Sequence, residues 1–173
     1  MTDKQFLSAF ESATLERAEW THEAHVRLAW LYLSKYPVAD ALEKVRGGIR
    51  RLNQAFASAG AAPCRPVDAQ NPPGYHDTIT VAFVRVIAGR LGAGEKYEAF
   101  RERNADLFDR SLSAIRKHYT KKVLFSAKAR KGFVEANRAP LPAVGPWGAE
   151  PQTGVAPAAR GRTKSRAVTA TSA

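Results

Sequence analysis

Three of the four histidines in the chain occur where they could act as metal ligands or carry protons. His22 and His25 stand three residues apart in the string Trp-Thr-His-Glu-Ala-His, and His76 occurs in the string Gly-Tyr-His-Asp-Thr. Neutral imidazole binds zinc, iron and other first-row metals, and it also exchanges protons near neutral pH. The first string is not the His-Glu-x-x-His motif of zinc proteases, because its second histidine comes one residue early. It therefore does not predict the zinc-protease mechanism.

Both strings lie where a helix is expected to begin. Thr21 suits the N-cap of a helix over about residues 21–36, and a second helix is expected over about residues 75–91. The three-residue spacing puts His22 and His25 on one face of the first helix, opposite its charged side chains. On a helical projection, His76 shares the apolar face of the second helix. The three imidazoles are therefore predicted to meet in the core.

Three core-facing imidazoles predict a metal site with His22, His25 and His76 as ligands, and zinc or iron as the ion. Burial disfavours the charged imidazolium, so neutral rings need partners, and one metal ion would satisfy all three. Glu23 and Asp77 each follow a histidine directly and lie off the core face, so they are expected either to orient the rings from outside the metal or to lie on the surface. Tyr32 and Tyr75 flank the expected site and are predicted to donate hydrogen bonds to a substrate.

This reading predicts a metal-dependent enzyme that acts on a small molecule. Because the positive ends of two helices would lie beside the metal, an anionic molecule is favoured. Two alternatives stay open. One is a metal-free binding module, in which the histidines and tyrosines line a small-molecule pocket. The other is binding of nucleic acid or another anionic partner through the basic C-terminal segment.

The hydrophobic periodicity predicts an all-α fold, a single-domain bundle of about five to six helices. The clearest stripe runs from Val38 to Phe56 with alternating spacings of four and three residues; Gly47 and Gly48 interrupt it and mark either a close helix contact or a weak turn. The other helices are expected over about residues 4–13, 21–36, 75–91, 95–103 and 106–119, with one further capped turn over 126–131. A long connection rich in proline and glycine covers residues 58–74.

The domain prediction is a helical domain over residues 1–142 and a disordered, basic tail over residues 143–173. The net charge is +11, but the first 115 residues carry 15 basic and 14 acidic side chains. The excess therefore lies in residues 116–138 and the tail, which weakens any proposal that the whole domain binds nucleic acid. His118 lies among these basic residues and is expected on the surface.

The remaining features favour a cytoplasmic protein. No apolar run reaches the length of a membrane span, and the first residues lack the pattern of a signal peptide. Cys64 is the only cysteine, so neither an internal disulfide nor a cysteine-based zinc site is expected.

Four strings resemble an uncharacterised family of small bacterial helical proteins. They are Trp-Thr-His-Glu-Ala-His, Gly-Tyr-His-Asp-Thr, Leu-Phe-Ser-Ala-Lys-Ala-Arg and Ala-Pro-Leu-Pro, and the resemblance covers roughly residues 5–142. That family usually has glutamate where this chain has Asp77. The architecture is also loosely similar to the DinB-like bundles, which hold a metal with three histidines, although their usual His-x-x-x-His pair is absent here. The resemblance supports the importance of the histidine strings but implies no activity.

Overall fold

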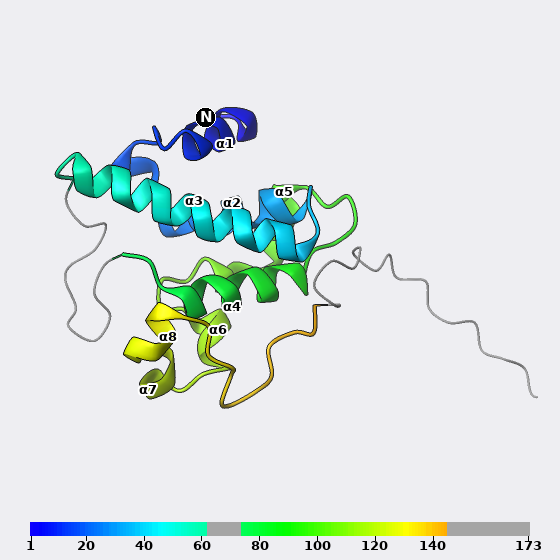
Figure 1. The fold of residues 1–173 in the computed structure, drawn as a ribbon. Helices are drawn as coiled ribbons and strands as arrows, with labels where there is room; N and C mark the ends of the chain where they lie inside the picture. Colours follow the sequence, from blue (N-terminus) through cyan, green and yellow to red (C-terminus); the bar gives the residue numbers. More distant parts are fainter. Residues whose placement is uncertain (62–73, 145–173) are drawn as a thin grey trace, which may run out of the picture.

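The computed structural model describes residues 1–61 and 74–144, and every regular element in these residues is a helix (Figure 1). The all-α prediction is confirmed. The predicted tail lies outside the described residues from position 145 onward, and so do residues 62–73 of the proline-rich connection.

The described residues form eight α-helices and two 3₁₀ helices, more than the five to six that the sequence predicted. In chain order they are α1 (Asp3–Glu11), η1 (Arg17–Glu19), α2 (His22–Leu33), α3 (Val38–Ser58), α4 (Asp77–Ala88), α5 (Tyr97–Arg103), η2 (Ala105–Leu107), α6 (Ser113–Arg116), α7 (Lys121–Leu124) and α8 (Ala127–Lys131).

Part of the difference between the expected and observed numbers of helices comes from a break in the helix expected over residues 106–119. Asp109 accepts hydrogen bonds from the backbone and the hydroxyl of Ser111, a side-chain turn that competes with helix. Leu112 then takes a left-handed backbone conformation, with φ of 62°. The chain consequently divides into η2 and α6, and the residues between them are free to line a cavity described below.

Threonine or serine residues cap the starts of α1, α2, α7 and α8. Thr21 accepts a hydrogen bond from the backbone of Ala24 at the start of α2, and Ser126 does the same for Ala129 at the start of α8. At α1 the cap is Thr2, one residue before the expected Asp3, in a capping box with Gln5. These caps satisfy N–H groups that have no partner inside the helix.

Helix α4 lies at the centre of the fold. It contacts α2 and α3 on one side, and α6 and α8 on the other (Figure 1). Its buried residues therefore point in all directions around the helix, among them Val81, Ala82, Val84 and Val86. A helix that is apolar on every face is stable only when it is enclosed in this way.

Gly48 marks a close contact between α1 and α3. A Cβ atom on Gly48 would overlap the ring of Phe10, a fully buried side chain of α1. Gly47 has nothing near the same position. The glycine pair therefore includes a true helix contact at Gly48, which was one of the two expected explanations.

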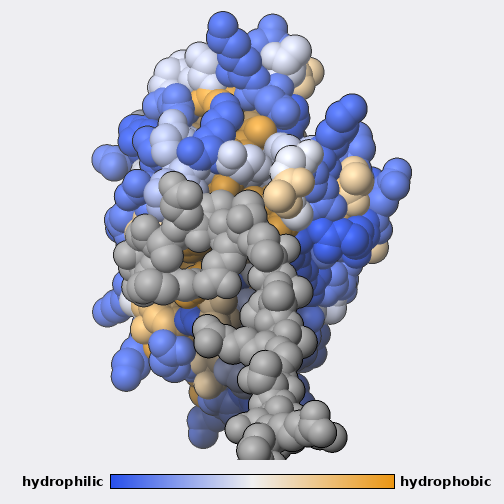
Figure 2. All heavy atoms as spheres, turned by 90° about the vertical axis from the view of Figure 1, so that its right-hand side faces the viewer, coloured by the Kyte–Doolittle hydropathy of each residue, from blue (hydrophilic) through white to orange (hydrophobic). Residues whose placement is uncertain are grey.

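The outer surface is hydrophilic over most of the face in Figure 2, with small scattered hydrophobic areas outside the grey region. Among the described residues, the large hydrophobic side chains that are exposed are Met1 and Tyr36. No helix within residues 1–61 and 74–144 is long and apolar enough to cross a membrane.

Candidate functional site: a cavity between α2, α3 and α4

The described residues line a partly open cavity of about 1020 Å³ between α2, α3 and α4. Cavities of roughly 300–1,000 Å³ accommodate drug-sized ligands. Much of the wall is apolar and comes from the sides of these helices that face one another: Val26, Ala29, Val45, Ile49, Ile79, Phe83 and Val84. Polar side chains break this wall at a few points, and several of them were singled out from the sequence.

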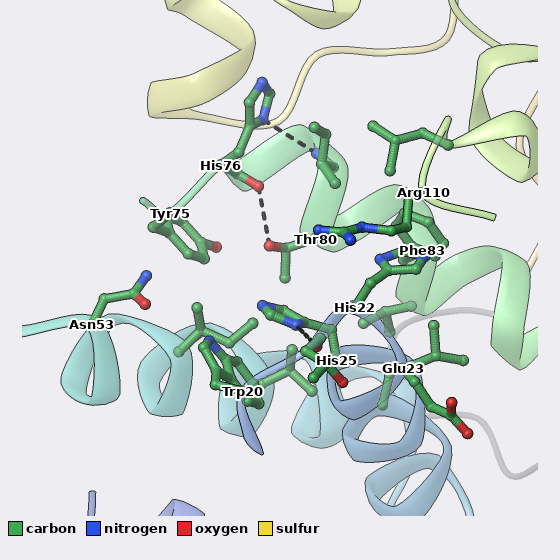
Figure 3. A pocket seen from close by; sticks show the side chains of 18 of the residues that line it. Trp20, His22, Glu23, His25, Asn53, Tyr75, His76, Thr80, Phe83 and Arg110 are labelled. Carbon is green, nitrogen blue, oxygen red and sulfur yellow. Dashed lines mark hydrogen bonds between the residues drawn. The ribbon is translucent and has the colours of Figure 1, made fainter. Parts of the chain in front are cut away.

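His25 faces this cavity, and its tautomer follows from its hydrogen bond. Its Nδ1 lies 2.6 Å from the carbonyl oxygen of Thr21, so Nδ1 carries the hydrogen and donates it. The ring stacks on Trp20, with centroids 3.9 Å apart. Burial lowers the pKa of His25 to about 4, so the ring is neutral at pH 7. Its Nε2 therefore presents a lone pair, and Figure 3 shows this nitrogen directed into the cavity.

His22 lies beside His25 on α2 and also lines the cavity, as predicted. Its Nε2 lies 2.9 Å from the carbonyl oxygen of Leu107, and its ring meets the ring of Phe83 edge-on. The Nε2–H group of His22 is thus occupied by the backbone. Burial is the main cause of the lowered pKa of His22, so this ring is also neutral at pH 7.

His76 does not join the other two imidazoles, which corrects the prediction that all three converge. Helix α4 begins at Asp77, so His76 is the N-cap residue, with an extended backbone (φ −140°, ψ 106°). A helical projection does not apply to such a residue. Its Nδ1 accepts a hydrogen bond from the backbone of Ile79, and its ring points away from His22 and His25 (Figure 3). Only its backbone oxygen faces Thr80 in this view.

The structure therefore provides two of the three expected metal ligands in one place. Within the described residues, no three or more histidine, cysteine, aspartate or glutamate side chains are grouped so that they could hold a metal ion. His22 and His25 each direct one ring nitrogen to a backbone carbonyl, which accounts for part of the hydrogen bonding that a metal was expected to satisfy. Zinc or iron stays a prediction from the sequence alone.

The two expected supporting carboxylates contact arginines rather than histidines. Glu23 accepts from Arg101 at 2.8 Å on the surface. Asp77, with 4% of its side chain exposed, accepts from Arg46 at 2.8 Å and from Arg50 at 3.4 Å. A role of Glu23 and Asp77 in orienting imidazoles therefore stays a prediction: in the structure Glu23 lies on the surface, and Asp77 joins α4 to α3.

The two predicted substrate-binding tyrosines have different positions. Tyr75 lines the cavity, and its hydroxyl donates to Asp77 at 2.6 Å while Arg50 covers its ring. Burial and this hydrogen bond raise the pKa of Tyr75 to about 12. Tyr32 lies outside the cavity, where its hydroxyl donates to Glu11 of α1. Its expected contact with a substrate is therefore not supported, because it lies on the side of α2 that faces α1.

Two arginines that the sequence did not single out also line the cavity. Arg110 comes from the broken segment between η2 and α6, and its side chain reaches across the cavity toward Thr80 in Figure 3. No ion pair involves Arg110 within residues 1–61 and 74–144. Arg17, next to Trp20, is the second. Among the described residues that line the cavity, Glu23 is the one acidic side chain, and its carboxylate is paired with Arg101. Within the described residues, the lining therefore carries the positive charge of Arg110 and no unpaired carboxylate to offset it.

The aromatic side chains of the basic segment over residues 116–138 are partly or fully buried. Tyr119 is buried, and Phe125 and Phe133 pack against the core. This burial leaves little ring surface for stacking with nucleic-acid bases, and binding through the basic segment stays a prediction. His118 is also buried, at 7% exposure, with Nδ1 3.1 Å from the carbonyl of Ala139, so its expected surface position was wrong.

Comparison with protein-family models, curated proteins and solved structures found no match for this chain. The two resemblances stated from the sequence therefore stay predictions. Function has to be inferred from the chemistry of the cavity.

Proposed function

We propose that this chain is a small-molecule binding domain that holds an organic anion in the cavity between α2, α3 and α4. The observation that carries the proposal is a large, mostly apolar cavity with Arg110 in its lining and, within residues 1–61 and 74–144, no carboxylate in that lining that lacks an arginine partner. A few polar groups set in an apolar wall are typical of ligand pockets. His25 and His22 serve as neutral hydrogen-bonding groups in this proposal, so it requires no metal ion.

The test is thermal denaturation of the full chain against a set of small organic anions and their uncharged analogues. A ligand present at about one hundred times its Kd stabilises a protein by about 2.7 kcal/mol, which raises Tm by several degrees. We expect at least one anion to do so and its uncharged analogue to be much weaker. A chelator should leave the effect unchanged, and Arg110→Gln should reduce it.

Two results would overturn this proposal. The first is that neutral or cationic compounds raise the Tm of the chain as much as the anions do. The second is stoichiometric zinc or iron in protein purified without an affinity tag, together with loss of ligand stabilisation on chelation. That second result would favour the metal-dependent enzyme predicted from the sequence.

A further inference from the structure

Three side chains of the cavity donate their hydrogens in hydrogen bonds to other groups of the protein. The Nδ1–H group of His25 donates to the carbonyl of Thr21, and the hydroxyl of Thr80 donates to the carbonyl of His76 at 3.0 Å. The hydroxyl of Tyr75 donates to Asp77 at 2.6 Å. Each of the three groups therefore keeps only lone pairs for a ligand.

The donor and acceptor roles in these three hydrogen bonds are fixed for physical reasons. A backbone carbonyl can only accept, so the direction of the bonds from His25 and Thr80 is fixed. A hydrogen bond from a neutral hydroxyl to a carboxylate is roughly twice as strong as one between neutral groups. The hydroxyl of Tyr75 therefore continues to donate to Asp77 when a ligand binds. The carboxylate is itself held in place by Arg46 and Arg50.

The acceptor atoms lie around one space. Figure 3 shows the hydroxyl oxygens of Tyr75 and Thr80 and the outer nitrogen of His25 directed toward the middle of the cavity. They come from both sides of it, because His25 belongs to α2 and Thr80 to α4, with Tyr75 just before α4. Arg110 extends into the same view from the far end.

From this arrangement we infer that the ligand carries hydroxyl or N–H donors on an apolar body, in addition to its anionic group. This inference rests on the proposed function and specifies the class of ligand. Hydroxylated aromatic or aliphatic carboxylates are compounds of this class. An anion of the same shape with alkylated oxygens leaves the three acceptors unpaired, and a buried acceptor without a donor is costly.

Three related probes separate the need for hydrogen-bond donors from the need for an anionic group, in calorimetric titrations of the full chain. The first, 3,4-dihydroxybenzoate, has both the donors and the anion. The second, 3,4-dimethoxybenzoate, keeps the anion and loses the donors. The third, methyl 3,4-dihydroxybenzoate, keeps the donors and loses the anion. We expect the first probe to bind at least tenfold more tightly than either of the others.

Isosteric variants assign the preference to particular atoms. Thr80→Val and Tyr75→Phe each remove one acceptor, and His25→Phe removes Nε2 while keeping a ring on Trp20. Each variant should weaken binding of the dihydroxy acid roughly threefold to tenfold, the usual range for one hydrogen bond, and should narrow its advantage over the dimethoxy acid. Tyr32→Phe is the matched control, because the hydroxyl of Tyr32 lies outside the cavity and donates to Glu11. This variant should change neither the affinity for the dihydroxy acid nor its advantage over the dimethoxy acid.

The outcomes distinguish this inference from the proposed function. If both acids bind equally and Ala29→Phe, which narrows the cavity, blocks both, the anion site stands and the inferred donors are wrong. If neither acid binds at millimolar concentration, the inference is overturned, while the wider set of anions tested by thermal denaturation still decides the proposed function. If the dihydroxy acid binds Ala29→Phe as well as it binds the unaltered chain, it occupies another place and the inference also fails.

Discussion

At the scale of single residues, His25 and His76 have similar chemistry and opposite surroundings. Both are neutral at pH 7, because burial lowers the pKa of each to about 4. His25 sits inside a helix and turns Nε2 to a cavity, whereas His76 precedes its helix and turns its ring away. The sequence placed His25 and His76 near helix starts, as the structure does, but α4 begins at Asp77, two residues later than expected, and this changed what His76 faces.

The first prediction concerns the dependence of stability on pH. An unfolded histidine has a pKa near 6.5, whereas folded His76 binds a proton only near pH 4. Between these values the unfolded chain binds more protons, so stability falls as the pH falls from about 6.5 to 4. His76, at 7% exposure, should contribute on the order of 3 kcal/mol to this loss.

Chemical denaturation at several pH values measures this contribution in His76→Asn. Asparagine keeps an N-cap side chain and does not titrate, so the variant should lose less stability on acidification than the unaltered chain. The same loss in both proteins between pH 6.5 and 4 would show that His76 does not hold a lowered pKa.

At the scale of elements, the contacts between helices depend on residues whose roles were not evident in the sequence. The stripe from Val38 to Phe56 predicted α3 well, because its period is long and regular. Nothing in the sequence paired Asp77 with Arg46 and Arg50, because ion pairs between helices leave no local pattern. The break at Leu112 was missed for a related reason: a left-handed leucine is uncommon, and the turn at Asp109 lies within an otherwise helical period.

The second prediction tests the link between α3 and α4. Arg46 approaches Asp77 at 2.8 Å with 23% of its side chain exposed, whereas Arg50 lies at 3.4 Å with 55% exposed. Arg46→Met should therefore cost roughly 2–3 kcal/mol of unfolding free energy, because it weakens the pairing of a buried carboxylate. Arg50→Met should cost about 1 kcal/mol or less. Equal losses in denaturant titrations would contradict this assignment.

The third prediction uses the neighbouring glycines of α3. Gly48→Ala should destabilise the chain by about 1–3 kcal/mol, because the new methyl group overlaps Phe10 of α1. Gly47→Ala meets no atom and should stabilise the helix by up to about 1 kcal/mol. Thermal denaturation of the two variants compares them directly, and a similar Tm for both would mean that α1 does not pack closely at Gly48.

At the scale of the whole molecule, the proposed function depends on a cavity that no single segment encodes. Its wall combines α2, α3, α4 and the broken segment before α6, and Arg110 enters it only because that segment is not helical. The sequence correctly predicted the all-α class, and three of the residues that it singled out, His22, His25 and Tyr75, line the cavity. It missed the arginines, since a charged side chain facing inward looks the same in sequence as one facing solvent.

The most direct test of this account is long-range ¹H–¹⁵N NMR of the histidine side chains, recorded at pH 7 with and without 3,4-dihydroxybenzoate. We predict a neutral His25 with its hydrogen on Nδ1, and a shift of its Nε2 resonance when the probe is added. His76 should be neutral with its hydrogen on Nε2, and its resonances should stay in place. A hydrogen on Nε2 of His25, or an Nε2 resonance that does not move on addition of the probe, would contradict the account.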